Sequence, residues 1–167
     1  MKWVIGTGLY VLLATVTFLF ADDATSSSSE KILFLSDKTD KPARFFMDAF
    51  IEELTAAGFD FIETAVDGKS LVDLESCRNI IVYSQVMAFN NISPVSAWVK
   101  ARKTLAGKRV YLFVTANRWF FGSRLKKLAD LVLARGGVVV DAVTMATHKM
   151  TEEQKQAGVR TLVAKIR

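Results

Sequence analysis

The sequence predicts an α/β domain with a doubly wound parallel sheet, and three observations lead to this fold class. The chain has 167 residues, of which 51% are apolar and 23% charged, as expected for one packed domain with a short appendage. From residue 31 onward, short apolar runs alternate with segments whose apolar residues have helical spacing. Parallel strands need crossover connections, usually helices, so this alternation favours a parallel sheet with helices on both faces.

Five short runs have the length of strands, and the first and third are apolar throughout, as in strands covered on both faces. The predicted strands are Lys31–Ser36, Phe59–Val66, Asn79–Tyr83, Arg109–Thr115 and Val138–Val143. Four segments between and after them have helical periodicity. The predicted helices are Pro42–Ala57, Ser93–Gly107, Ser123–Arg135 and Thr151–Arg167. The domain is therefore expected to span residues 31–167.

Local signals mark the helix boundaries. Pro42 suits a first turn because its missing N–H needs no partner there, and Gly58 is suited to end the same helix. Ser93 and Thr151 are N-cap candidates, since a hydroxyl can accept a hydrogen bond from a first-turn N–H. Gly136, which is followed by a second glycine, ends the third helix. Each predicted helix thus begins or ends at a residue suited to that position.

Residues 1–21 form an apolar segment ahead of this domain. The nineteen residues from Trp3 to Ala21 have no charged side chain, and about 20 apolar residues span a bilayer as a helix. We expect an uncleaved membrane anchor, a transmembrane signal-anchor helix. Two alternatives stay open. One is a cleaved signal peptide, for which Ala21 fits the −1 position although Leu19 is large for −3, and the other is a buried helix of the fold.

Flanking charges predict how this segment is oriented. Lys2 and the α-amino group precede it, and Asp22 and Asp23 follow it. The positive-inside rule therefore leaves the N-terminus cytoplasmic and places the domain on the extracytoplasmic side of the membrane. Residues 22–30 contain four consecutive serines, which is typical of a flexible tether. The expected localisation is membrane-anchored, with secretion after signal cleavage as the alternative.

Composition restricts the chemistry of the chain. One cysteine and one histidine can form neither an internal disulfide nor a structural zinc site, so we predict no metal site. A Ser-His-Asp arrangement finds no support with His148 as the one histidine. The net charge of +5 suits an anionic ligand or a membrane surface. It is too small and too scattered along the sequence to indicate nucleic acid, for which no motif is present.

The candidate binding residues lie in three loops expected at the carboxyl ends of strands, where open parallel sheets bind ligands. The first loop joins the first strand to the Pro42 helix. Hydroxyl and ammonium groups next to a helix N-terminus favour a phosphate. The candidate phosphate-binding residues are Ser36, Lys38, Thr39 and Lys41. A solvated turn with an Asp or Thr N-cap is the alternative, and the loop lacks the glycines of a P-loop.

The second loop follows Tyr83, and the third follows the strand that ends at Thr115. Each combines polar side chains with an aromatic one, so two aromatic rings could stack against a flat heterocycle from two sides. The candidate ring-binding residues are Ser84, Gln85, Phe89, Asn117 and Trp119. The alternative is that these aromatic residues pack under the sheet edge or contact lipid.

The run NIIVYSQVMAFNNISPVSAWVKARKTLAGKRVYLFVT, from Asn79 to Thr115, resembles the middle of the flavodoxin-like family. In that family a strand, a polar loop and a helix precede a Gly-Lys turn and a further strand with its ligand loop. The Ser36-x-x-Thr39 turn also lies where the family binds the flavin phosphate. The resemblance is one of pattern from residue 31 to about 165. It implies a five-stranded sheet of order 2-1-3-4-5, FMN at the loops after the first, third and fourth strands, and one- or two-electron transfer.

The leading hypothesis is therefore a membrane-tethered flavodoxin-like domain that binds FMN and transfers electrons, with a redox protein or a quinone as its partner. The family's phosphate loop is Ser/Thr-x-Thr-Gly-Asn-Thr, whereas Lys38, Thr39 and Asp40 occupy its Thr, Gly and Asn positions here. This departure keeps a second hypothesis open: a flavin-free module that binds a partner protein or a small anion at the membrane. A hydrolase or transferase is a third hypothesis, which lacks a nucleophile–base pair.

Overall fold

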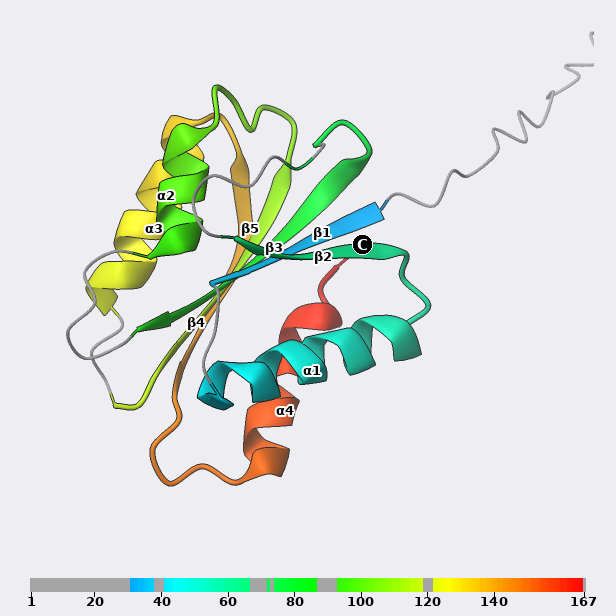
Figure 1. Cartoon of the computed structure of the whole chain (residues 1–167), viewed down its shortest axis with the longest axis vertical. Coiled ribbons are helices and arrows are strands. Elements are labelled where there is room, and N and C mark those ends of the chain that lie inside the picture. The colour runs from blue at the N-terminus through cyan, green and yellow to red at the C-terminus, as the bar shows by residue number, and fades with distance from the viewer. Residues whose placement is uncertain are drawn as a thin grey trace, which may run out of the picture.

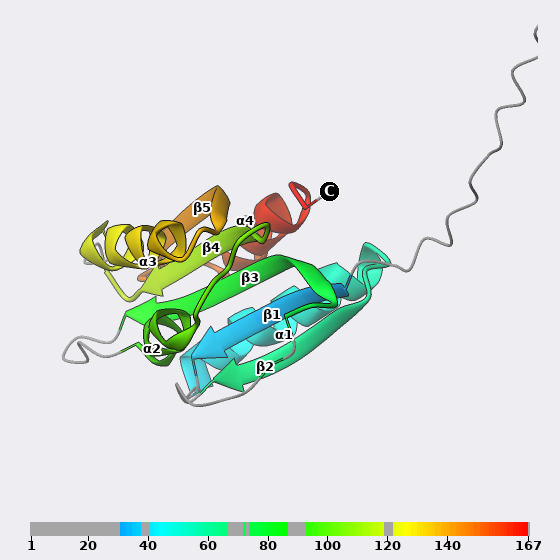
Figure 2. The same ribbon diagram turned by 90° about the horizontal axis from the view of Figure 1, so that it is seen from above.

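The five strands of the domain are parallel and lie in the order β2-β1-β3-β4-β5 (Figure 2). Their bounds are β1 Lys31–Asp37, β2 Phe61–Val66, β3 Cys77–Val86, β4 Arg109–Ala116 and β5 Val138–Ala146. The order reverses between β1 and β3, and this switch point is where open α/β sheets bind ligands. The α/β class and the strand order predicted from the sequence are confirmed.

The four helices of the described residues cover the two faces of the sheet (Figure 1). Their bounds are α1 Lys41–Ala56, α2 Pro94–Ala101, α3 Gly122–Ala134 and α4 Glu152–Val163. Helices α1 and α4 lie on one face, and α2 and α3 lie on the other (Figures 1 and 2). The domain therefore has three layers, with the sheet in the middle.

This structure is a computed structural model, and it describes residues 31–37, 41–66, 72, 74–86, 93–118 and 122–166. In these ranges no helix is both long and apolar enough to cross a membrane. The predicted anchor, residues 1–21, and the tether, residues 22–30, lie outside the described residues.

Strand β1 shows how the sequence builds a core on each face. Successive side chains of a strand point to opposite faces, so Ile32 and Phe34 pack under α1 and α4, while Leu33 and Leu35 pack under α2 and α3. All four are fully buried. This explains why the run is apolar without alternation, as expected for a strand covered on both faces.

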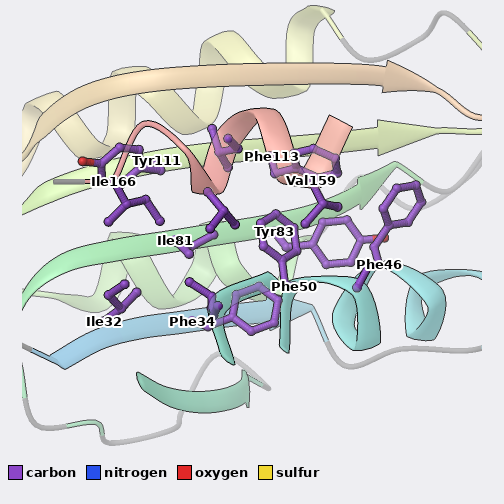
Figure 3. Packing of buried hydrophobic residues seen from close by; sticks show 14 of the residues in the cluster. Ile32, Phe34, Phe46, Phe50, Ile81, Tyr83, Tyr111, Phe113, Val159 and Ile166 are labelled. Atoms are coloured by element: carbon purple, nitrogen blue, oxygen red, sulfur yellow. The ribbon is translucent and has the colours of Figure 1, made fainter. Parts of the chain in front are cut away.

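The core beneath α1 and α4 contains six buried aromatic side chains among aliphatic ones (Figure 3). The Phe50 ring lies 5.0 Å from that of Phe34 and 5.1 Å from that of Phe113, measured between centroids. Phe46 lies 5.7 Å from Tyr83 and 5.6 Å from Phe113. These separations are in the range of favourable ring pairs, so helix α1 is fixed to β1, β3 and β4 by one cluster of rings.

Strand β3 is longer than the sequence pattern indicates. The apolar run ends at Tyr83, but the strand continues to Val86 because Ser84 and Gln85 pair in parallel register with Val114 and Thr115 of β4. The prediction that Ser84 and Gln85 lie in a loop is therefore wrong. Backbone pairing with a neighbour extends the strand past the point where its side chains become polar.

Helix α2 ends at Ala101, six residues before the predicted end at Gly107. Arg102 has extended backbone angles, which stop the helix, and the chain then turns so that the Leu105 N–H donates to the Arg135 carbonyl at 2.7 Å. Leu105 is only 2% exposed, so it enters the core from a loop rather than from a helix. Its apolar spacing from Trp98 suggested a longer helix than the one that forms.

The N-cap predictions are confirmed for two helices. Ser93 precedes α2, and its hydroxyl accepts a hydrogen bond from the Ser96 N–H at 3.3 Å. Thr151 precedes α4 in a capping box with Gln154: the Thr151 hydroxyl accepts from the Gln154 N–H, and the Gln154 side chain accepts from the Thr151 N–H. Helix α4 ends at Val163, short of the predicted Arg167.

The aromatic core gives the first test of this architecture. Phe50→Ala should lower the free energy of unfolding by about 3–5 kcal/mol, since it leaves a cavity between three rings. Leu133 is an apolar control with 58% of its surface exposed, and Leu133→Ala should cost no more than about 0.5 kcal/mol. Urea unfolding followed by circular dichroism measures both, and equal losses for the two variants would contradict this packing.

Candidate ligand site at the carboxyl edge

The candidate site lies where β1 and β3 end and where α1 and α2 begin. Because the strands are parallel, their carboxyl ends meet at one edge of the sheet, to which the arrowheads of β1, β2 and β3 point in Figure 2. The strand order reverses between β1 and β3 at this edge. Helices that follow the strands turn their N-termini toward the same edge, and their unpaired N–H groups favour anions there.

A buried carboxylate occupies the gap between β1 and α2. Asp37, the last residue of β1, is only 7% exposed. It accepts hydrogen bonds from the Ser84 hydroxyl at 2.8 Å, from the Val95 N–H at 2.9 Å and from the Ser93 hydroxyl at 3.1 Å. The Gln85 N–H donates to it at 3.3 Å. Four donors therefore compensate the removal of this charge from water.

The Asp37 network joins three elements that are far apart in the sequence. Ser84 and Gln85 belong to β3, while Ser93 and Val95 belong to the N-terminal turn of α2. The Val95 N–H is one of the helix donors that lack an intrahelical partner, and a carboxylate is favourable there. The chain's own Asp37 thus fills the anion position at the N-terminus of α2.

The N-terminus of α1 has a different character. Strand alternation places Ser36 on the opposite face of β1 from Asp37, on the side of α1. The Ser36 hydroxyl is fully buried and has no hydrogen-bond partner among the residues that the structure describes, which do not include residues 38–40. The first turn of α1 contains no acidic residue and begins with Lys41. An unpaired buried hydroxyl is costly, so this is the position at which an added anionic group would gain hydrogen bonds.

Aromatic side chains lie beneath the edge on this same face of the sheet. The Tyr83 hydroxyl and the Thr115 hydroxyl, on adjacent strands β3 and β4, are 3.2 Å apart and buried. Phe46 of α1 packs against Tyr83, so the layer below the edge is closed (Figure 3). Gln85 is the next residue outward on this face of β3 and is half-buried. Its amide group can therefore contact a ligand bound above the side chains of Tyr83 and Phe46.

The backbone after β4 is held by the segment that follows β5. The Thr147 N–H donates to the Ala116 carbonyl at 2.8 Å, and the His148 N–H donates to the Asn117 carbonyl at 2.8 Å. The Thr147 hydroxyl also donates to the Ala116 carbonyl, at 3.1 Å. The Asn117 side chain itself is exposed. Its backbone is thus positioned while its amide faces outward at the carboxyl edge.

The structure brings part of the predicted site together. Ser36, Ser84, Gln85 and Asn117 all lie at the carboxyl edge, and Lys41 begins α1 beside them. Ser84 is fully buried, and its hydroxyl is engaged with Asp37. The other four predicted residues lie outside the described residues; they are Lys38, Thr39, Phe89 and Trp119.

Asp37, which is central to the carboxyl edge, is not among the residues predicted for the site. The sequence does indicate that Asp37 faces inward. Asp37 continues the alternation of Leu33 and Leu35, whose side chains point into the core under α2 and α3, so its carboxylate is expected on the same buried face. Ser93 was recognised as a helix cap, but its second hydrogen bond to Asp37 depends on tertiary structure. The hydrogen-bond partners of Asp37 and Ser93 cannot be predicted from the spacing of residues that are close in the sequence.

A shallow groove between the C-terminal ends of α1 and α4 lies away from this edge. It is lined by Glu53, Ala56, Ala57, Arg160, Val163 and Ala164. Arg160 and Glu53 pair across it at 3.0 Å, and this hydrogen-bonded carboxylate raises the pKa of Arg160. Its polar groups therefore satisfy one another, and the groove does not rival the carboxyl edge as a ligand site.

The sheet order, the helices on both faces and the ligand edge at the β1/β3 switch point define a flavodoxin-like fold. Flavodoxin 2 from Bacillus cereus has 17% sequence identity and a TM-score of 0.62, with 81% of this chain and 98% of that chain covered. Megasphaera elsdenii flavodoxin has 14% identity and a TM-score of 0.58, with 79% and 98% covered. A putative quinone reductase from Klebsiella pneumoniae has 14% identity and a TM-score of 0.57, with 82% and 83% covered.

These three structures share the fold of this chain across nearly the whole described domain. The flavodoxin-like resemblance predicted from the sequence is confirmed at the level of fold. No family model matches the sequence, and no curated protein matches it either.

The Asp37 network can be tested by its effect on stability. Asp37→Ala should lower the free energy of unfolding by about 2–4 kcal/mol, because it leaves buried donors of β3 and α2 without their acceptor. Asp130→Ala removes an exposed carboxylate from α3 and should change stability by no more than about 0.5 kcal/mol.

A double-mutant cycle separates the network from general disruption. Asp37→Ala and Ser84→Ala should be non-additive by about 1 kcal/mol or more in urea unfolding, since both remove the same hydrogen bond. Additive losses would show that Asp37 and Ser84 act independently, contrary to the geometry.

Proposed function

We propose that this chain binds FMN at its carboxyl edge and transfers electrons as a flavodoxin-like oxidoreductase domain. The observation that supports this most directly is the buried Ser36 hydroxyl on the α1 side of β1, at the switch point of the sheet, for which the described part of the chain supplies no hydrogen-bond partner. The fold similarity to flavodoxins and to a putative quinone reductase supports the same class of function.

The residues at α1 fit a phosphate. Ser36 offers an unpaired hydroxyl, Lys41 offers a cationic residue at the first position of the helix, and the first-turn N–H groups offer the positive end of the helix dipole. The predicted partners Lys38 and Thr39 belong to the segment between Ser36 and Lys41. All of these groups are donors or cations, as a phosphate dianion requires.

Polar groups further along the edge fit the ring of a flavin. Gln85 and Asn117 follow the buried parts of β3 and β4 and present amides that can donate and accept hydrogen bonds. The predicted stacking residues Phe89 and Trp119 belong to the same two connections. FMN, when bound, supplies one- and two-electron chemistry, and the residues of the chain orient it and exclude water from one side.

The site fits a ligand with one phosphate rather than two. Asp37 already occupies the N-terminus of α2, and its negative charge disfavours a second anion there. Helix α1 then provides the remaining N-terminal anion position at the switch point. A mononucleotide such as FMN meets this condition better than a dinucleotide does.

We further propose that residues 1–21 anchor the domain to the membrane and that residues 22–30 tether it on the extracytoplasmic side. The nineteen uncharged residues from Trp3 to Ala21 and the charges that flank them support this topology. A redox protein or a quinone would then exchange electrons with the flavin at the membrane.

A flavin-free function is the second candidate, and one observation favours it. The donors of β3 and α2 that face the switch point are saturated by Asp37, so this side of the site offers a ligand few hydrogen bonds. In this case the α1 end would bind a small anion or a partner protein, without electron transfer.

A comparison of FMN with riboflavin tests the proposed function. Binding of FMN to the chain should quench the fluorescence of the flavin, which gives the dissociation constant. Riboflavin lacks the phosphate and should bind at least about tenfold more weakly, because the phosphate makes charge-assisted hydrogen bonds. Ser36→Ala and Lys41→Gln should each weaken FMN binding several-fold and leave riboflavin binding unchanged.

Matched controls make this test specific. Thr161→Ala in α4 and Lys127→Gln in α3 replace exposed residues that lie away from the carboxyl ends of the strands, and they should leave FMN binding unchanged. Equal affinities for FMN and riboflavin would contradict the phosphate site. Absence of binding to both, together with an increase in melting temperature on addition of inorganic phosphate, would favour the flavin-free candidate.

The membrane anchor predicts how the chain fractionates in cells. The full chain should stay in the membrane fraction after washing with alkaline carbonate, and a variant that lacks residues 2–21 should not. Mass spectrometry of the membrane-bound form should find Met1 or Lys2 as its N-terminus. An N-terminus at Asp22 would instead establish cleavage after Ala21.

A further inference from the structure

The groove between the C-terminal ends of α1 and α4 is a concave surface that no side chain of the described ranges fills. Ala56 and Ala57 line it from the end of α1, and Val163 and Ala164 line it from the end of α4. The three alanines are exposed. The groove has a volume of about 290 Å³, which gives room for one large side chain but not for a helix. We call this surface the α1–α4 groove.

Arg160 and Glu53 bound the groove on its polar side. Arg160 contacts the Glu53 carboxylate with Nε at 3.1 Å and with Nη2 at 3.0 Å. Because these two charges pair with each other, a charged ligand gains little in the groove. The surface that remains is apolar, and the removal of apolar surface from water is favourable. The groove therefore favours an apolar side chain.

The groove lies beside the point at which residues 1–30 join the domain. The Ile32 N–H donates to the Asp60 carbonyl at 2.9 Å, and Lys31 pairs with Asp60 at 3.7 Å. Asp60 follows Ala57 by three residues, so their Cα atoms are at most about 11 Å apart. Figure 1 shows the start of β1 on the side of the domain where α1 and α4 end.

Phe20 is the large apolar residue of the preceding segment that is nearest to the domain in the sequence. Residues 21–30 contain no apolar side chain larger than that of alanine. The eleven residues from Phe20 to Lys31 span at most about 40 Å, so Phe20 can reach the groove. Three further segments outside the described ranges contain large apolar residues, but they follow β2, β3 and β4 and begin at the carboxyl edge; they are 67–71, 87–92 and 119–121.

The tether makes a weak contact sufficient. Short flexible linkers give effective concentrations in the millimolar range, so a contact with a dissociation constant of about 1 mM is occupied about half of the time. Residues 22–30, with their four serines, have the composition of such a linker. Phe20 lies one residue before the end of the predicted anchor, so it is expected at the membrane surface rather than at the bilayer centre.

We infer that Phe20 docks in the α1–α4 groove and that residues 21–30 form a closed loop beside it. This inference rests on the proposed anchor, because cleavage after Ala21 would remove Phe20, and it is independent of flavin binding. Docking fixes the orientation of the domain on its anchor. The candidate site stays clear of the contact, because the seven residues of β1 separate the two edges of the sheet by about 20 Å.

Disulfide formation in the full chain, reconstituted in phosphatidylcholine nanodiscs, tests the docking. A chain with Ala21→Cys and Ala57→Cys should form an intramolecular disulfide with copper phenanthroline, since this bond needs Cα atoms about 4–7 Å apart. The chain retains Phe20, and the native Cys77 is fully buried. A disulfide between two chains would place the segment in the groove of a neighbouring molecule and would overturn the inference.

Ala134 gives a matched control position. It is an exposed alanine at the end of α3, on the opposite face of the sheet. The neighbouring Leu133 is an exposed apolar residue, so a tether that contacts any apolar surface would react at this position too. Ala21→Cys should react at least about fivefold faster with Ala57→Cys than with Ala134→Cys. Equal rates would overturn the inference.

Substitution of Phe20 separates docking from proximity. In the chain with Ala21→Cys and Ala57→Cys, Phe20→Ala should slow disulfide formation at least about fivefold, because it removes the side chain that fills the groove. Leu19→Ala is the control and should change the rate less than about twofold. An unchanged rate with Phe20→Ala would show that another group occupies the groove, contrary to the inference.

The anchor and the docking fail in different ways. An N-terminus at Asp22 in the mass spectrum would contradict both of them. An intact membrane-bound chain in which the Ala57→Cys position forms no disulfide would contradict the docking alone. The titrations with FMN and riboflavin are unaffected in either case.

Discussion

The hydrogen bonds of the Asp37 carboxylate determine how the carboxyl edge of this domain is built. At the switch point of a flavodoxin-like sheet, the chain continues from β1 to a helix on one face and from β3 to a helix on the other. The ends of these two strands therefore need an interaction that joins them. Here Asp37 provides it, with donors from β3 at Ser84 and from α2 at Ser93 and Val95. A charge that ends a fully buried strand is stable because four donors and the N-terminus of α2 surround it.

The alternation of β1 then divides the edge into two different environments. Asp37 faces α2, where its carboxylate is fully hydrogen-bonded, whereas Ser36 faces α1 and finds no hydrogen-bond partner within the described ranges. Two adjacent residues thus give the two faces of the edge different polar groups, a hydrogen-bonded carboxylate on the side of α2 and a hydroxyl on the side of α1. In the proposed function, side chains and the α1 N-terminus supply the phosphate contacts, since the sequence between Ser36 and Lys41 contains no glycine.

Much of this fold could be predicted from the sequence, because it depends on local signals. The apolar runs located all five strands, and Pro42, Ser93 and Thr151 located helix starts. The failures involve residues whose placement depends on distant partners. Ser84 joins β3 only through its pairing with β4, and Leu105 leaves α2 because Arg135 accepts its N–H. For the same reason Asp37 could be predicted to face inward, but its donors, 47 to 58 residues away, could not be identified.

The distribution of charge over the surface also depends on residues that are far apart in the sequence, and it differs between the two edges of the sheet. Along the chain the basic residues are scattered, but parallel strands all start at one edge and their helices all end there, so Lys31, Arg78 and Arg109 come together. The topology that collects helix N-termini around Ser36 necessarily collects helix C-termini, which favour cations, at the opposite edge.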